Sequence, residues 1–144
     1  MKKIILFINM AILLGCSSSN EEEIETNDSD VVYDNLVWAD EFNDSSLDTD
    51  KWFHQTIGPN GGKWFNDELQ HYTDSNTNSF VSDGNLHIVA KKETKTQNGV
   101  SLNYTSARLN SKYAFTYGRV DVRAKLPEGN GTWPAIWTLG KNIS

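Results

Sequence analysis

Residues 118–126, Gly-Arg-Val-Asp-Val-Arg-Ala-Lys-Leu, decide the fold class of this chain. Apolar residues hold the even positions from Val120 to Leu126, and charged residues hold the odd positions from Arg119 to Lys125. Side chains of a β-strand point alternately to its two faces, so this pattern predicts a half-buried antiparallel strand. A helix would need apolar residues three and four positions apart, and no long segment of the chain shows that period.

Shorter alternating segments and turn sequences surround this strand. Period-two alternation recurs in residues 85–91, 104–110 and 133–139. Clusters rich in glycine, asparagine, proline or aspartate, which favour turns, lie at residues 58–62, 83–85, 97–99 and 127–131. Many short strands separated by turns predict an all-β fold, either a sandwich or a jelly roll.

The chain is short for such a fold. All-β sandwiches often take about 200–250 residues, whereas only residues 36–144 are available here. The sequence stops at Ser144, soon after a strongly apolar segment, and a sheet cut at that point would expose an unpaired edge. We therefore expect residues 36–144 to be the N-terminal part of a domain truncated after roughly its first half.

The first sixteen residues indicate export. Lys2 and Lys3 precede an apolar run over residues 4–14 that only Asn9 interrupts. As a helix the run would reach only ~17 Å, against a hydrocarbon core of ~30 Å, so it predicts a signal peptide and not a membrane span. The run closes on Leu-Leu-Gly-Cys, which resembles a bacterial lipobox, and Cys16 is the only cysteine of the chain. Lipidation of Cys16 is expected, and an ordinary secretory signal with a chance cysteine is the alternative.

Residues 17–35 form an acidic, serine- and asparagine-rich segment. It holds seven acids and no basic residue, and it has too few apolar side chains to offset the entropy of ordering, so it predicts a disordered tether. The run also resembles the surface-export signal of Bacteroidetes lipoproteins, and a plain spacer is the equally weighted alternative. The expected location is the bacterial outer membrane, through a lipid anchor.

The charge balance argues against a nucleic-acid partner. The chain carries a formal charge of −6, but from residue 36 onward twelve acids face eleven basic residues. This nearly neutral domain lacks the basic stripe that phosphate backbones require.

Aromatic residues suggest a ligand for this domain. The chain has five tryptophans and five tyrosines, and aromatic rings can stack on the flat faces of sugars while their N–H or O–H groups bond hydroxyls. Trp38 and Trp52 are more simply explained as core residues. Trp133 and Trp137 fall on one face of the same expected strand, after a glycine-rich loop, so we expect them to face a ligand.

Six blocks of the sequence, in order, resemble glycoside hydrolase family 16, in its laminarinase-like branch. They are residues 36–52, which include Trp-Ala-Asp-Glu-Phe-Asn, 66–73 (Asn-Asp-Glu-Leu-Gln-His-Tyr-Thr), 83–88 (Asp-Gly-Asn-Leu-His-Ile), 104–109 (Tyr-Thr-Ser-Ala-Arg-Leu), 117–127 and 133–140 (Trp-Pro-Ala-Ile-Trp-Thr-Leu-Gly). The resemblance implies a concanavalin-like β-jelly-roll with a cleft for a polysaccharide chain. It also implies retaining endo-hydrolysis of β-glucans, most often at β-1,3 linkages.

The resemblance implies that the catalytic residues are not in this chain. The family motif Glu-x-Asp-x-x-Glu places two carboxyl groups ~5–5.5 Å apart, one as nucleophile and one as acid. No such motif occurs in the sequence, and the family's catalytic strand would follow Ser144. We therefore assign no catalytic residue and expect this chain alone to be inactive. Glu68 would belong to a segment that shapes the cleft.

Four residues match binding positions of the family. The resemblance implies that Asn66 bonds a sugar hydroxyl, that Arg108 lies beneath the reacting sugar, and that Trp133 and Trp137 form an aromatic wall. The alternatives are a turn-forming amide for Asn66 and a structural salt bridge for Arg108.

The resemblance further implies one structural calcium ion, held partly by carbonyl groups near Glu41 and Gly84 and completed by a later aspartate. Oxygen ligands of this kind suit calcium. No cofactor is expected to take part in the chemistry.

Taken together, these patterns predict a monomeric, lipid-anchored endo-β-glucanase that acts on a β-glucan polysaccharide. The first alternative is a non-catalytic glycan-binding surface lipoprotein on the same fold. A purely structural envelope lipoprotein is a third interpretation. It would require Arg108 and the two late tryptophans to be buried together, with a partner for the guanidinium.

Overall fold

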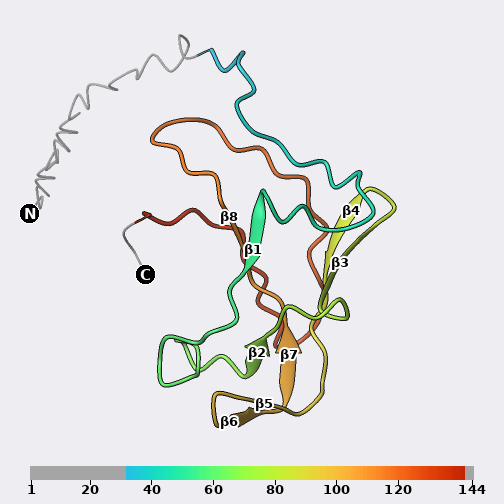
Figure 1. Cartoon of the computed structure of the whole chain (residues 1–144), viewed down its shortest axis with the longest axis vertical. Helices are drawn as coiled ribbons and strands as arrows, with labels where there is room; N and C mark the ends of the chain where they lie inside the picture. The colour runs from blue at the N-terminus through green and yellow to red at the C-terminus, as the bar shows by residue number, and fades with distance from the viewer. Residues whose placement is uncertain (1–31, 142–144) are drawn as a thin grey trace, which may run out of the picture. The chain divides into compact units, whose positions relative to one another are not determined.

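A computed structural model describes residues 32–141 (Figure 1). The chain divides after Val32, and the fold described below belongs to the unit that begins at Tyr33. The expected signal peptide, the lipidation site at Cys16 and most of the acidic tether lie outside the described residues. Within residues 32–141, no helix is long and apolar enough to cross a membrane.

The described elements are eight strands of three or four residues each. They are β1 (Trp52–His54), β2 (Gln70–Tyr72), β3 (Ser79–Ser82), β4 (Asn85–Ile88), β5 (Lys95–Gln97), β6 (Val100–Leu102), β7 (Tyr104–Ser106) and β8 (Leu109–Ser111). No helix occurs between residues 32 and 141. The expected all-β class is therefore confirmed.

Two of the expected turns close hairpins. β3 pairs antiparallel with β4 through the two residues Asp83 and Gly84, and β5 pairs with β6 through Asn98 and Gly99 (Figure 1). All four residues have positive φ, between 51° and 78°. Asp-Gly and Asn-Gly are the pairs that accept this backbone in two-residue type I′ turns, which explains why the chain reverses at these positions.

The segment from β7 to β8 joins the other two pairs of strands. β2 runs parallel to β7, with Tyr72 opposite Ser106, and β1 runs antiparallel to β8, with His54 opposite Leu109. Beyond β1, the Gln55 amide donates to the Arg108 carbonyl at 2.9 Å. The two strands therefore meet the same segment, one after the other along its length.

Alternation along this segment separates a buried face from an open one. Thr105 and Ala107 are 0% and 6% exposed, and His71 and Thr73 of the neighbouring strand are 1% and 3% exposed. Tyr72 and Arg108 occupy the alternate positions, so their side chains point to the opposite, partly open face.

The buried face is held by polar contacts more than by apolar ones. Thr73 donates to Asn78 Oδ1 at 2.6 Å, and Asn78 Nδ2 donates to Thr105 Oγ1 at 3.0 Å. Thr105 Oγ1 in turn donates to Glu93 Oε1 at 2.6 Å, a bond that lowers the pKa of Glu93. The buried polar side chains of Thr73, Asn78 and Thr105 thus each have a partner, as burial requires.

Two expected strands are not formed. Residues 112–141 contain no strand and run as an irregular ribbon (Figure 1). Val120, Val122 and Leu126 are 55–57% exposed, so the strands predicted over 118–126 and 133–139 were wrong for this structure. The reason is that alternation describes a surface able to pack, whereas a strand also requires a hydrogen-bonded neighbour, and none of residues 32–141 pairs with this segment.

Trp38 and Trp52, expected in the core, pack against each other but are only half-buried. The rings of Trp38 and Trp52 meet edge to face with centroids 5.4 Å apart, and Trp38 also stacks on Tyr113 at 6.1 Å. The Trp52 Nε1 group donates to Asp40 Oδ2 at 2.7 Å. We call Trp38, Trp52, Tyr113 and Asp40 the Trp52 cluster.

Candidate functional site

Arg108 lies between β7 and β8 on the open face, and Gln55 holds it in place. The Arg108 Nε group donates to Gln55 Oε1 at 2.8 Å. The same oxygen accepts a hydrogen bond from Asn110 Nδ2 at 3.0 Å. Because Gln55, Arg108 and Asn110 face each other across paired strands, backbone pairing sets the position of the guanidinium.

Two tryptophan rings flank the guanidinium. Its central carbon lies 5.0 Å from the ring centroid of Trp64 and 4.8 Å from that of Trp137. Both distances are within the range of a cation–π interaction. Trp64 is 4% exposed and Trp137 is 57% exposed, so one ring is part of the packed interior and the other faces solvent.

Tyr72 completes the group, which we call the arginine cluster: Arg108, Trp64, Trp137 and Tyr72. The Tyr72 ring meets Trp64 edge to face at 4.8 Å, and its hydroxyl donates to Glu68 Oε2 at 2.9 Å. Burial, followed by the hydrogen bond to Glu68, raises the pKa of Tyr72 to about 12. Glu68 also accepts a hydrogen bond from Gln70 at 2.8 Å, so this carboxylate is engaged in holding its own segment.

The charge of Arg108 has no acidic partner in the described part of the chain. Ion pairs there join Lys51 to Asp40, Lys51 to Asp48, Lys91 to Glu93, and Arg119 to Asp121, but none includes Arg108. The alternative of a structural salt bridge is therefore not what residues 32–141 show. A cation flanked by rings and bound to a neutral amide is suited to contact a polar ligand.

The indole N–H of Trp64 is a further polar group of this cluster. Its buried Nε1 has no hydrogen-bond partner among residues 32–141. Leaving a buried donor unpaired costs about 1–3 kcal/mol. The arginine cluster therefore contains an indole donor and a cation that the described chain leaves uncompensated.

Asn66 is placed in a turn beside this cluster. It is exposed and has φ +61°, and Asp67 has φ +56°. The turn is closed by the Glu68 amide donating to the Phe65 carbonyl at 3.4 Å. Asparagine and aspartate accept positive φ more readily than most residues, which supports the turn-forming alternative. The expected contact of Asn66 with a sugar stays a prediction.

The structure brings Trp137 to Arg108 but leaves Trp133 apart. Trp133 is 75% exposed, and it makes no aromatic or cation–π contact with a described residue. Trp137 therefore contacts another predicted binding residue, and the aromatic wall itself stays a prediction for both rings. Trp133 as a ligand contact stays a prediction.

The expected calcium position involves two segments that lie near each other. Glu41 and Gly84 are both exposed, and a Cβ atom on Gly84 would lie 3.6 Å from Asn43 Oδ1. Carbonyl and amide oxygens from these segments are donors that calcium accepts. No group of three or more histidine, cysteine or acidic side chains that could hold a metal occurs within residues 32–141. Calcium binding stays a prediction.

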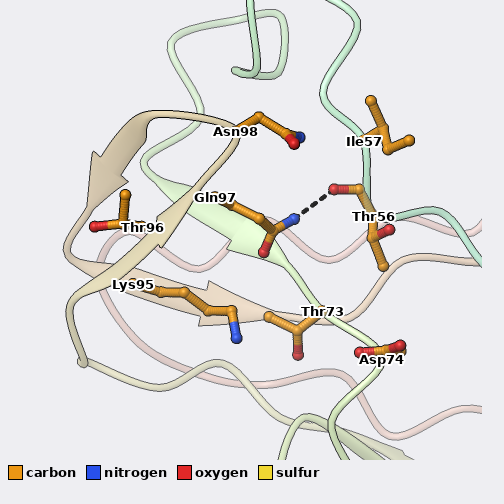
Figure 2. A pocket seen from close by; sticks show the side chains of 8 residues that line it. All are labelled: Thr56, Ile57, Thr73, Asp74, Lys95, Thr96, Gln97 and Asn98. Carbon is orange, nitrogen blue, oxygen red and sulfur yellow. Dashed lines mark hydrogen bonds between the residues drawn. The ribbon is translucent and has the colours of Figure 1, made fainter.

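A separate polar pocket of about 360 Å³ opens between the ends of β1 and β2 and the β5–β6 hairpin (Figure 2). Gln97 Nε2 donates to the Thr56 carbonyl at 2.6 Å beside it (Figure 2). The pocket is lined by Thr56, Ile57, Thr73, Asp74, Lys95, Thr96, Gln97 and Asn98. The lining includes no aromatic ring and no member of the arginine cluster.

Sequence reasoning missed Trp64, Gln55 and Tyr72. Trp64 stands two residues before Asn66, and nothing in the sequence distinguishes it from a core aromatic. Gln55 reaches Arg108 only because β1 pairs with β8, a register that no local pattern reveals. Gln55 could have been found only by predicting that residues 52–54 pair with residues 109–111.

The arginine cluster thus offers ring faces and N–H donors side by side. The sequence matches the model of Glycosyl hydrolases family 16 over residues 65–144. That is more than half of the chain, which therefore belongs to glycosyl hydrolases family 16.

Curated relatives agree with this family. The chain is 45% identical over 118 residues to "Glucan endo-1,3-beta-glucosidase A1" of Niallia circulans, covering 75% of this chain and 17% of that protein. It is 41% identical over 134 residues to "Beta-glucanase" of Rhodothermus marinus, covering 90% of this chain and 43% of that protein. The chain thus spans less than half the length of these relatives.

A solved structure supports the fold. LamA of Zobellia galactanivorans, in a variant complexed with laminaritriose and laminaritetraose, is 56% identical with a TM-score of 0.59. The match covers 60% of this chain and 36% of that one. The expected jelly-roll class is thereby confirmed, for the part of the fold that the chain covers.

Proposed function

We propose that the protein is a retaining endo-β-glucanase whose substrate is a β-1,3-glucan. The observation that carries this proposal is Arg108, which lies between Trp64 and Trp137 with no acidic partner among residues 32–141. Such a group offers a cation, N–H donors and ring faces to a sugar. The relative from Niallia circulans is a glucan endo-1,3-beta-glucosidase, which supports the β-1,3 linkage, and the beta-glucanase of Rhodothermus marinus supports a β-glucan.

In this proposed enzyme, residues 36–144 contribute substrate binding, and the catalytic carboxylates are not among them. The 144 residues contain no Glu-x-Asp-x-x-Glu motif. Glu68 belongs to no such motif, and its Oε2 atom accepts hydrogen bonds from Tyr72 and Gln70 that hold its own segment.

The test is hydrolysis of laminarin by the full-length protein. We expect new reducing ends from internal cleavage, products of retained anomeric configuration when followed by NMR, and slower cleavage of a galactan. Laminarin binding without hydrolysis would favour the non-catalytic glycan-binding alternative, which no observation supports over the enzyme. The absence of both would refute the proposal.

We also propose that the protein is anchored to the outer membrane through an acylated Cys16 and acts as a monomer. The lipobox-like sequence before this lone cysteine supports the anchor. Fractionation of cells that express the wild type and Cys16→Ser tests it: the variant should leave the membrane fraction. A variant that remains in the membranes would contradict lipid anchoring.

A further inference from the structure

Gln55 makes three hydrogen bonds that link it to Arg108 and to Asn110. Its amide N–H donates to the Arg108 carbonyl at 2.9 Å. Its Oε1 atom accepts from Arg108 Nε at 2.8 Å and from Asn110 Nδ2 at 3.0 Å. The Gln55 side chain, directly after β1, thus binds the Arg108 guanidinium through its Nε atom alone.

The other contacts of the Arg108 guanidinium are with two aromatic rings. Trp64 and Trp137 lie within 5.0 Å of its central carbon. None of the hydrogen bonds found among residues 32–141 uses its terminal nitrogens. An arginine has five N–H donors in a fixed fork, so fixing Nε orients the four terminal donors without occupying them.

The chemical nature of the acceptor matters as much as its position. The other arginine in the described chain that makes an Nε hydrogen bond is Arg119, and it donates to Asp121 Oδ1 at the same distance of 2.8 Å. That acceptor is a carboxylate, which compensates the charge, whereas Gln55 is a neutral amide. Arg108 is therefore oriented without being neutralised.

We propose that Gln55 is a positioning residue of the glycan site, one that orients Arg108 while preserving its full positive charge for the substrate. This inference rests on the proposed function. The neutrality of the amide is the essential property, since a glutamate of the same size would keep the hydrogen bonds and cancel the charge.

The decisive variant is Gln55→Glu in the full-length protein. We expect laminari-oligosaccharide affinity, measured by calorimetry, to fall about ten-fold because a charged hydrogen-bond donor becomes paired within the protein. The thermal midpoint should not fall, because the new carboxylate pairs with Arg108.

Two further variants separate orientation from charge. Asn98→Asp adds the same charge at the exposed tip of the β5–β6 hairpin, where φ is +51°, and should leave affinity unchanged. Gln55→Met keeps the bulk but removes the acceptor, so both affinity and thermal midpoint should fall.

The outcomes are distinguishable. A wild type that hydrolyses laminarin, together with a Gln55→Glu variant of unchanged affinity, would overturn this inference alone. A wild type that neither binds nor cleaves any β-glucan would overturn the proposed function and this inference with it.

Discussion

The Trp52 cluster and the arginine cluster are built from the same kinds of side chain but are completed differently. In the Trp52 cluster the indole N–H donates to Asp40 at 2.7 Å, and Lys51 Nζ lies 3.8 Å from the same carboxylate. In the arginine cluster, neither the Trp64 indole N–H finds an acceptor nor Arg108 an acidic partner among residues 32–141. The Trp52 cluster satisfies its indole N–H from within the described chain, whereas the arginine cluster does not.

This difference separates stability from binding. A buried polar group without a partner costs free energy, and functional sites are where such costs are commonly retained. Changes in the Trp52 cluster should therefore alter stability alone. Changes in the arginine cluster should alter glycan affinity as well.

The largest effect is expected from Trp64→Ala. Removing a ring that is 4% exposed and contacts both Tyr72 and Arg108 should destabilise the full-length protein by about 3–5 kcal/mol. Urea denaturation measures this loss, and glycan affinity should fall too because Arg108 loses its inner ring. A variant of wild-type stability would show that Trp64 is not part of the packed interior.

Arg108→Ala should affect binding more than stability. Loss of a charged donor is expected to weaken binding by about 1.5–3 kcal/mol, more than ten-fold in affinity. Calorimetry with a laminari-oligosaccharide provides the measurement, and near-ultraviolet circular dichroism checks the fold. Arg119→Ala is the matched control, because that arginine pairs with Asp121 on an exposed segment. Equal affinity in both variants would exclude Arg108 from the site.

Trp52→Phe tests the other cluster. The change keeps an aromatic ring but removes the hydrogen bond to Asp40, whose charge makes that bond worth about 1.5–3 kcal/mol. Urea denaturation should report the loss of stability, while glycan affinity stays at the wild-type value. A fall in affinity would mean that the two clusters are coupled, which would break the comparison.

Some features of the fold and of the arginine cluster could be predicted from the sequence, and others could not. The Asp83-Gly84 and Asn98-Gly99 turns were predictable because a two-residue reversal needs particular residue types at particular φ angles. Arg108 and Trp137 could be named as candidate binding residues because they stand in blocks that resemble the family. The contact between Arg108 and Gln55 was not, because it depends on a pairing of strands more than fifty residues apart.

Residues 118–126 show the opposite case, in which a clear local pattern was not sufficient. Their alternation is the cleanest in the chain, yet the structure forms no strand there. Pattern specifies which face can be buried, but the neighbour that buries it comes from elsewhere in the fold.

The ionisation of Tyr72 offers a smaller effect, visible by ultraviolet titration. Its pKa of about 12 exceeds the ordinary value of 10. The folded state therefore holds this proton more tightly than the unfolded state, so the stabilisation is present below pH 10 and is lost as pH rises towards 12. Glu68→Gln should lower the pKa by removing a negative neighbour, and Arg108→Ala should raise it by removing a positive one. An unchanged titration in both variants would contradict the cluster geometry.

The smallest effect, and the sharpest test of the comparison, is expected from Trp64→Phe. Phenylalanine keeps an aromatic ring near Tyr72 and Arg108 but removes the indole N–H that has no partner in the described chain. The loss of ring volume destabilises, whereas the removal of an unpaired donor stabilises. The two contributions oppose each other, so the stability change in urea should be smaller than that of Trp52→Phe. If Trp64→Phe instead cost more than Trp52→Phe, the Trp64 indole would have a partner in the full-length protein, and the contrast between a self-satisfied cluster and an open one would rest on Arg108 alone.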